Sequence, residues 1–215
     1  MRRTLLVLTF GSMLTASADA QTKWVGSIQG GYSVSTSTAE NFPAGGSFGT
    51  SAFIGRQVKP LLAVGFEAGF FDVENTTTVS RGDCFFTGVP LGCNVTSVVE
   101  VNWIQFGGTA RIGESSGHWR PYGALGLAVY FGTRDADVTY EDIETGQGPY
   151  GDGTVRTTRT AVGGSIGGGL DWAPNESPWS LGLSARLHYL IGGDENGEFA
   201  GDTFVTLLAG VGYRW

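Results

Sequence analysis

This chain of 215 residues has little charge, few basic side chains, two histidines and two cysteines. Charged residues make up 15% of the sequence, whereas a soluble globular domain has about 25%. The 20 acidic residues outnumber the 13 basic ones, for a net charge of −7. Because nucleic acid is bound through clusters of Lys and Arg, this balance argues against nucleic acid as a partner.

The chain also lacks an apolar run long enough for a membrane-spanning helix, which needs about 20 residues. A shorter apolar run from Leu5 to Leu14 follows Arg2 and Arg3 and precedes the A-x-A tripeptide that ends at Ala20. This order of charged, apolar and small residues is typical of a secretory signal peptide. We therefore predict a signal peptide over residues 1–20 and one mature domain over residues 21–215, without a transmembrane helix.

The two cysteines, Cys84 and Cys93, are nine positions apart. In an exported protein such a pair predicts a disulfide that closes a small loop. A metal site would need more ligands nearby, so we expect no metal and no cofactor.

The sequence that remains alternates between apolar residues and small or polar ones, which is the two-residue period of β-strands. Eight segments show it, at roughly 23–34, 47–56, 62–74, 98–113, 119–133, 156–172, 179–191 and 203–215. Long polar connections follow the first, third, fifth and seventh segments (about 35–46, 75–97, 134–155 and 192–202), whereas the others are short. Alternating short turns and long loops are typical of a transmembrane β-barrel in an outer membrane.

A lipocalin or a secreted β-sandwich also offers about eight strands, and the two faces of each strand distinguish these alternatives. In the segment 179–191, Trp, Leu, Ala, Tyr and Ile share one face, and the other carries Ser180, Ser184, Arg186 and His188. A lipocalin would place its apolar face inside, around a ligand, where Arg186 and Arg111 could not easily be held. We therefore expect the apolar face to contact lipid and the polar face to line the lumen.

Tryptophan follows the same division. Five of the six tryptophans lie on the apolar face, next to a short turn or a chain end: Trp24, Trp119, Trp172, Trp179 and Trp215. We predict that they form an aromatic girdle at the periplasmic edge. Tyr189 lies toward the other edge, and at about 3.3 Å per residue in a tilted strand it is roughly 23 Å from Trp179, close to the ~25 Å apolar band of such barrels.

On these residues the chain resembles the small eight-stranded outer-membrane β-barrel proteins of OmpA, OmpX and OmpW type. The segment from Pro121 to Gly126 (PYGALG) is similar to a recurring phrase of their fifth strand, and the ending with Gly210, Tyr213 and Trp215 resembles the signal read by the barrel-assembly machinery. Leu208 departs from that signal, which usually has a polar residue there.

This resemblance implies an all-β fold: an eight-stranded antiparallel up-and-down barrel with short periplasmic turns and four longer extracellular loops. It also implies a monomer in the outer membrane of a Gram-negative cell envelope, in contact with outer-membrane lipid and lipopolysaccharide.

The two-residue alternation of the predicted strands places a set of polar side chains inside the barrel: Glu67, Gln105, Arg111, Arg186 and His188. Because charges in a narrow barrel must find partners, we expect a satisfied polar plug. The alternative is a gated pore in which Glu67 pairs with Arg186 or Arg111. The acidic long loops either form a solvated surface or hold Ca²⁺ or Mg²⁺, although their spacing does not match a calcium-binding loop.

We do not expect an enzyme. Acyl transfer by an outer-membrane barrel usually needs a serine and a histidine held by a carboxylate, and the lipid A deacylase group carries a His-x-Ser pattern on its lipid-facing side. His188 is instead followed by Tyr189 and Leu190, and it faces the lumen. The sequence therefore predicts a structural or surface-display protein whose loops are interaction sites, with a narrow porin-like channel for small solutes as the alternative.

Overall fold

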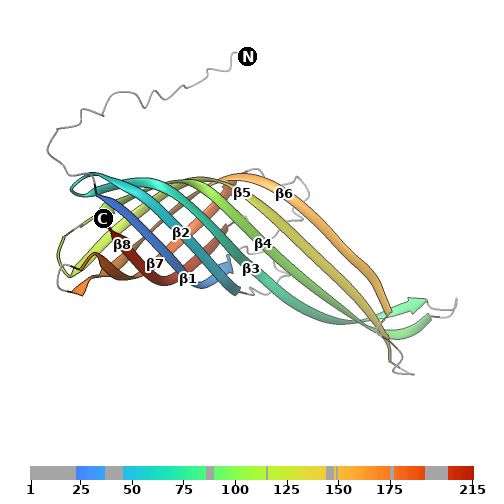
Figure 1. Ribbon diagram of the computed structural model, residues 1–215. Coiled ribbons are helices and arrows are strands. Elements are labelled where there is room, and N and C mark those ends of the chain that lie inside the picture. Colours follow the sequence, from blue (N-terminus) through green and yellow to red (C-terminus); the bar gives the residue numbers. More distant parts are fainter. Residues whose placement is uncertain are drawn as a thin grey trace, which may run out of the picture.

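The computed structural model describes residues 23–36, 46–85, 90–114, 116–143, 148, 150–174, 177–191 and 203–215. They form a closed barrel of eight strands in chain order, each antiparallel to its neighbours (Figure 1). The strands are β1 (Trp24–Ser35), β2 (Gly46–Lys59), β3 (Leu62–Phe85), β4 (Pro90–Gly113), β5 (Trp119–Asp142), β6 (Tyr150–Trp172), β7 (Trp179–Ile191) and β8 (Thr203–Arg214). The predicted eight-stranded antiparallel barrel is thus confirmed, and the predicted signal peptide lies outside the described residues.

The first and last strands close the barrel. β1 pairs with β8 from Val25, opposite Arg214, to Ser35, opposite Phe204. The backbone of Trp24 and that of Trp215 also exchange two hydrogen bonds, of 2.9 and 3.1 Å. The end of the chain is therefore paired like any other strand, which removes the exposed edge that an open sheet would leave.

None of the described residues belongs to a helix that is long and apolar enough to cross a membrane.

The outer surface of the barrel is apolar, as the alternation predicts. In β7 every second residue from Trp179 to Ile191 is exposed, and the residues between them are buried. Leu127 in β5 is 75% exposed. Such a surface is unfavourable in water and suits a hydrocarbon environment.

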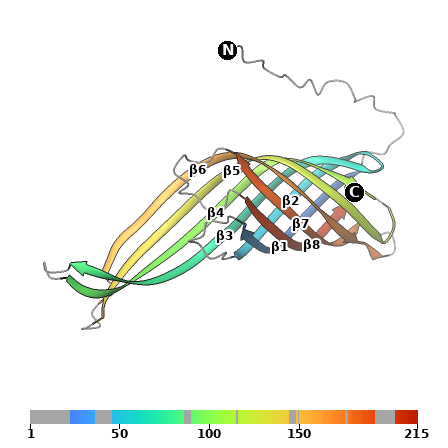
Figure 2. The same ribbon diagram turned by 180° about the vertical axis from the view of Figure 1, so that it is seen from behind.

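The middle strands are longer than predicted. β3, β4 and β5 have 24 residues each and β6 has 23, whereas β1, β2, β7 and β8 have 12 to 14. The predicted loops at 75–97 and 134–155 are therefore wrong in large part, because most of their residues continue these four strands. The ends of β3 to β6 project from the barrel as one sheet, which we call the extension (about 74–85, 90–100, 133–142 and 150–158), and the carboxyl terminus lies at the opposite end (Figures 1 and 2).

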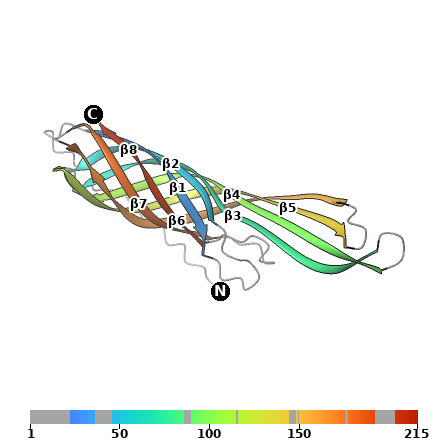
Figure 3. The same cartoon turned by 90° about the horizontal axis from the view of Figure 1, so that it is seen from below.

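The composition of these segments explains the difference. Residues 76–79 read TTTV and residues 95–101 read VTSVVEV. β-Branched residues favour extended backbone regardless of whether they are apolar, so a threonine-rich stretch forms strands although it looks like a polar loop. The register of β3 on β4 shifts between Asp72 and Glu74, at the base of the extension. Such a bulge bends the strands locally, and the extension leaves the barrel along a curved path (Figure 3).

The interior has two layers, of which the sequence predicted one. Polar side chains line the half of the barrel nearer the short turns. Toward the extension, an apolar core that we call the aromatic plug fills the lumen: Phe71, Val73, Val99, Val101, Trp103, Ala128, Tyr130, Ala161, Leu190, Phe204 and Leu208. The expectation of a wholly polar lumen is therefore wrong in this half.

Candidate functional site

The centre of the polar half is a buried ion pair across the lumen. Arg186 Nη1 of β7 lies 2.7 and 2.6 Å from the two carboxylate oxygens of Glu67 on β3. The side chains are 4% and 2% exposed, respectively. The hydroxyl of Thr109 donates a third hydrogen bond to Glu67, at 3.0 Å. The structure thus selects Arg186, rather than Arg111, as the partner of Glu67.

Arg111 is held in a different way. Its guanidinium donates a hydrogen bond of 3.0 Å to Ser27 Oγ. The guanidinium carbon lies 3.9 Å from the centre of the Phe53 ring and 5.2 Å from that of Tyr122. Such contacts are cation–π interactions. They place the charge of Arg111 close to the end of the barrel that carries the short turns.

Gln105 and Gln29 lie in the same layer, fully enclosed. Gln29 Oε1 accepts a hydrogen bond of 2.9 Å from the Ser184 hydroxyl. Gln105 is 1% exposed, and its Oε1 has no hydrogen-bond partner among the described residues. Four of the five predicted lumen residues, Gln105 among them, therefore belong to the polar layer.

His188 marks the boundary with the aromatic plug. Its ring stacks on Phe204 at 4.4 Å with an interplanar angle of 3°, and it lies 5.1 Å from the ring of Phe71. Its Nδ1 is 3.1 Å from the Tyr130 hydroxyl. His188 therefore packs among aromatic rings, and its described polar contacts are with the hydroxyls of Tyr130 and Thr206.

The sequence reasoning missed the aromatic plug, although signals for it were present. Phe71, Trp103 and Phe204 lie on the polar face by parity, as Leu208 does. Trp103 is fully buried, and its ring contacts that of Tyr130 edge-on at 6.4 Å. Large apolar residues on the lumen side predict a filled interior when several of them fall at one level of the barrel.

The five predicted girdle tryptophans lie on the outer surface near the turns and the chain ends, and all are exposed. Trp24 stacks on Trp215 with ring centres 6.5 Å apart, and Trp119 lies 6.4 Å from Trp172. Trp179 contacts Tyr213 edge-on at 4.6 Å. Tyr213 and Trp215 of the predicted assembly signal thus belong to the same aromatic belt. The third member of that signal, Gly210, lies against β1, where a Cβ would collide with the carbonyl of Ile28.

The two cysteines lie in the extension and not in an irregular loop. In the register of β3 on β4, Cys93 pairs with Gly82 and Cys84 with Leu91, so the cysteines are two positions apart on neighbouring strands. Cys93 is fully buried. The side chain of Cys84 lies outside the described residues, and the disulfide stays a prediction.

Acidic residues of the predicted third loop lie largely on β5. Asp135 accepts two hydrogen bonds, of 2.7 and 2.8 Å, from the Arg156 guanidinium on β6. This contact holds the pKa of the Asp135 carboxyl below its ordinary value of 3.8. Within the described parts of the chain, His, Cys, Asp and Glu form no group of three or more that could hold a metal ion.

Comparison with known proteins identifies the family. The model of the outer membrane protein beta-barrel domain family matches residues 4–214. The chain belongs to this family. Its place is therefore the outer membrane.

Solved structures of other outer-membrane proteins share the fold of this outer-membrane barrel. Neisserial surface protein A (NspA) is 12% identical, with 90% of this chain and 97% of that chain covered and a TM-score of 0.55. A major outer membrane protein from Thermus thermophilus is 13% identical, with 91% and 100% covered and a TM-score of 0.55. At such low identity the likeness concerns the fold alone. No curated protein sequence matches the chain.

Family membership also orients the barrel. Outer-membrane barrels have short turns on the periplasmic side and long connections outside the cell. Trp119, Trp172 and Trp179 of this outer-membrane barrel are exposed beside the short turns, and their role as a girdle at the periplasmic boundary stays a prediction. The extension of β3 to β6 stands on the extracellular side.

Proposed function

We propose that this outer-membrane barrel is a surface-display protein that holds the extension outside the membrane as an interaction surface. The observation that carries the proposal is the length of the central strands. Phe131 belongs to the outward-facing aromatic residues of β5, and β5 continues to Asp142. At about 3.3 Å per residue, the stretch from Phe131 to Asp142 spans roughly 36 Å along the strand. The strand therefore continues well past the length that a barrel needs to cross its membrane.

The surface of the extension suits contact with another molecule. Val79 on β3 and Val155 on β6 are 64% and 66% exposed, among polar and threonine-rich neighbours. The described strands leave β3 without a partner on one side beyond Phe71 and β6 without one beyond Val162. A strand edge offers backbone hydrogen bonds to an added peptide, and side chains beside it supply selectivity.

The barrel interior supports display over transport. A channel needs a continuous polar path, and the aromatic plug interrupts it: Phe71, Trp103, Tyr130 and Phe204 are each less than 2% exposed. The alternative function, a narrow channel for small solutes, is favoured by the Glu67–Arg186 pair in the polar half. Opening that pair alone would leave the plug in place.

We further propose that the protein is not an enzyme. His188 is enclosed in the aromatic plug, and His118 lies exposed in the turn between β4 and β5. Among the described residues, neither histidine contacts a serine or a carboxylate that would build a nucleophile and its base. We also propose outer-membrane lipid and lipopolysaccharide as surroundings of the apolar face, and the barrel-assembly machinery as the reader of the ending at Trp215.

The display proposal is tested by cysteine labelling in intact cells, in a Cys84→Ser/Cys93→Ser background. Val155→Cys on the extension should react with a membrane-impermeant maleimide without permeabilisation. Glu114→Cys, at the opposite end of the barrel, should react only after the outer membrane is permeabilised. Leu127→Cys, on the lipid-facing surface, serves as the matched control that stays unlabelled in both states.

Equal labelling of Val155→Cys and Glu114→Cys in intact cells would overturn the proposed display. A shortened variant then separates the two functions. Removing residues 77–98 and 136–155 and joining each pair of ends by Asn-Gly retains the partners Thr76 and Val99, and Asp135 and Arg156, at the new hairpin ends. If solute flux into vesicles is present and survives this shortening, the channel function is supported in place of display.

A further inference from the structure

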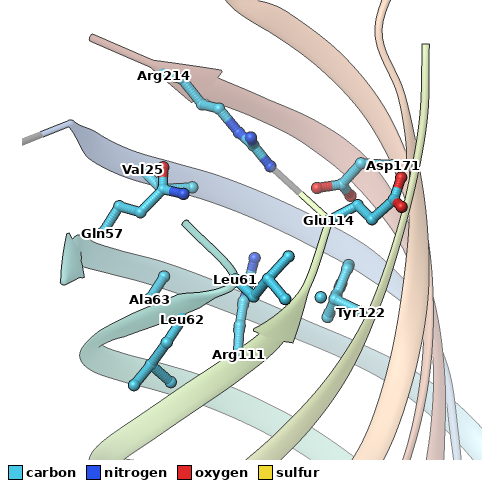
Figure 4. Close-up of a pocket in the computed structure, with 11 residues that line it drawn as sticks. Val25, Gln57, Leu61, Leu62, Ala63, Arg111, Glu114, Tyr122, Asp171 and Arg214 are labelled. Atoms are coloured by element: carbon cyan, nitrogen blue, oxygen red, sulfur yellow. The ribbon is translucent and has the colours of Figure 1, made fainter. Parts of the chain in front are cut away.

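A cavity at the periplasmic mouth of the barrel is lined by a buried arginine that forms no ion pair at hydrogen-bond distance with a described carboxylate. The cavity has a volume of about 40 Å³ and lies where β1 begins, β4 and β6 approach their turns, and β8 ends (Figure 4). Its polar lining consists of Gln57, Arg111, Glu114, Tyr122, Asp171 and Arg214. A cavity of this size with several polar groups holds water or a small polar ligand.

Arg111 is the buried charge. It is 7% exposed, and its one hydrogen-bond partner among the described residues is the neutral hydroxyl of Ser27. Its Nε is fully enclosed and has no partner in the described part of the chain. A guanidinium carries five N–H donors and no acceptor, and a buried charge is costly unless a group of opposite charge pairs with it. Within the described residues, Arg111 has two cation–π contacts and one hydrogen bond but no acidic partner at hydrogen-bond distance.

Two further arginines, Arg120 and Arg214, add positive charge near Arg111. Arg120 is 6% exposed, and although its Nε donates to the carbonyl of Gly117, its Nη1 is enclosed without a partner among the described residues. Arg214 lines the cavity. The hydroxyl of Tyr122 is a third enclosed polar group without a described partner.

The acidic groups near the cavity do not cancel this charge. Asp171 interacts electrostatically with Arg111, Arg120 and Arg214. Glu67 also acts on Arg111, but its carboxylate is held by Arg186. Glu114 is exposed next to the turn, where water screens its charge. Against the two carboxylates of Glu67 and Asp171, the four arginines Arg111, Arg120, Arg186 and Arg214 leave an excess of positive charge in this half of the barrel.

We propose that this cavity is a binding site for a small anionic group, a carboxylate or a phosphate, that enters from the periplasm. The anionic oxygens accept hydrogen bonds from Arg111 Nε and from Arg214 at the mouth, and planar guanidinium groups match both anions. Figure 4 shows Arg111, Tyr122, Asp171 and Arg214 around the same space. The site is at the opposite end of the barrel from the extension and is independent of surface display.

The test is calorimetric titration of the full chain, refolded in detergent, with sodium acetate or sodium phosphate at constant ionic strength. Wild-type protein should bind at least one of the two anions saturably, and the pair of titrations distinguishes a carboxylate ligand from a phosphate ligand. Arg111→Met should weaken that binding at least tenfold, since each charged hydrogen bond contributes more than about 1.4 kcal/mol, a factor of ten.

Arg214→Gln lies at the mouth of the cavity and gives a second test should Arg111→Met fail to refold. It should also weaken binding severalfold. Arg56→Gln, on β2 near the same end but with an exposed side chain, is the matched control and should bind as the wild type does. No saturable binding of either anion by wild-type protein would overturn the proposal and indicate that the cavity holds water. Wild-type affinity in both the Arg111→Met and Arg214→Gln variants would overturn it equally.

Discussion

The ion pair between Glu67 and Arg186 is the contact whose loss should cost the barrel most. The substitution Glu67→Gln keeps the shape of the side chain and removes its charge. Arg186 Nη1, now 2.7 and 2.6 Å from two carboxylate oxygens in an environment where it is only 4% exposed, would face a neutral amide. Removing one partner of a buried pair costs about 3–5 kcal/mol because the other charge stays buried without compensation.

The free energy of unfolding in urea, measured in lipid vesicles by tryptophan fluorescence, gives this cost. Glu67→Gln and Arg186→Met should each lose about 3–5 kcal/mol. The double variant should lose clearly less than the sum of the two, because it leaves neither charge unpaired. Arg156→Gln removes a partner of the exposed pair on the extension and is the control, for which we expect no measurable change in unfolding of the barrel. A loss of less than about 1 kcal/mol for Glu67→Gln, or additive losses in the double variant, would refute the reasoning.

Three further perturbations test other parts of the structure. Phe204→Ala removes a ring from the aromatic plug and should lower the free energy of unfolding by about 3–5 kcal/mol, measured in the same urea assay; a loss near zero would mean that the plug is not packed. Deleting Trp215 should reduce the amount of heat-modifiable, folded protein in the outer membrane, as seen by comparing boiled and unboiled samples on a gel, while the purified chain still refolds in detergent; normal insertion would contradict the assembly role. The pKa of the Asp135 carboxyl is lowered by its hydrogen bonds with Arg156, so the contact is present above the ordinary value of 3.8 and is lost as the pH falls through the lowered pKa. An NMR titration of Asp135 should give an ordinary pKa in the Arg156→Gln variant, and an unchanged midpoint would exclude the contact.

The sequence predicted the number of strands, their order and which face meets lipid, because these depend on a period of two that each strand carries in full. β7 and β8 were predicted to within one residue at each end, since Pro178 and glycine-rich or acidic stretches flank them. The same period predicts that Arg186 faces the lumen and that Trp179 faces outward. Local pattern was sufficient for these features.

The length of β3 to β6 did not follow from the same pattern. Residues 76–78 are three threonines, and a run of identical polar residues has no alternation to reveal a strand, although β-branching favours one. These strands extend because β3 pairs with β4, and β5 with β6, beyond the level at which the other four strands end. Such pairing is a property of two segments together and is not visible in either one alone.

The interior needed three-dimensional information for a related reason. The two-residue alternation placed Glu67 and Arg186 inside the barrel. The choice of Arg186 over Arg111 as the partner of Glu67 depends on where each arginine lies along the barrel axis. Phe71 and Phe204 are far apart in the chain, yet their rings lie 5.4 Å apart and enclose His188. A single aromatic residue on a polar face gives a weak signal, and only the barrel register brings several to one level.

Conductance across a planar lipid bilayer tests the central claim, a barrel closed by its aromatic plug that acts through its extension. We predict no steady conductance for the wild type, and none for Glu67→Ala, because breaking the ion pair with Arg186 leaves Trp103, Tyr130 and Phe204 across the lumen. A steady open state in Glu67→Ala, well above the wild type, would contradict the account and establish the gated channel in its place.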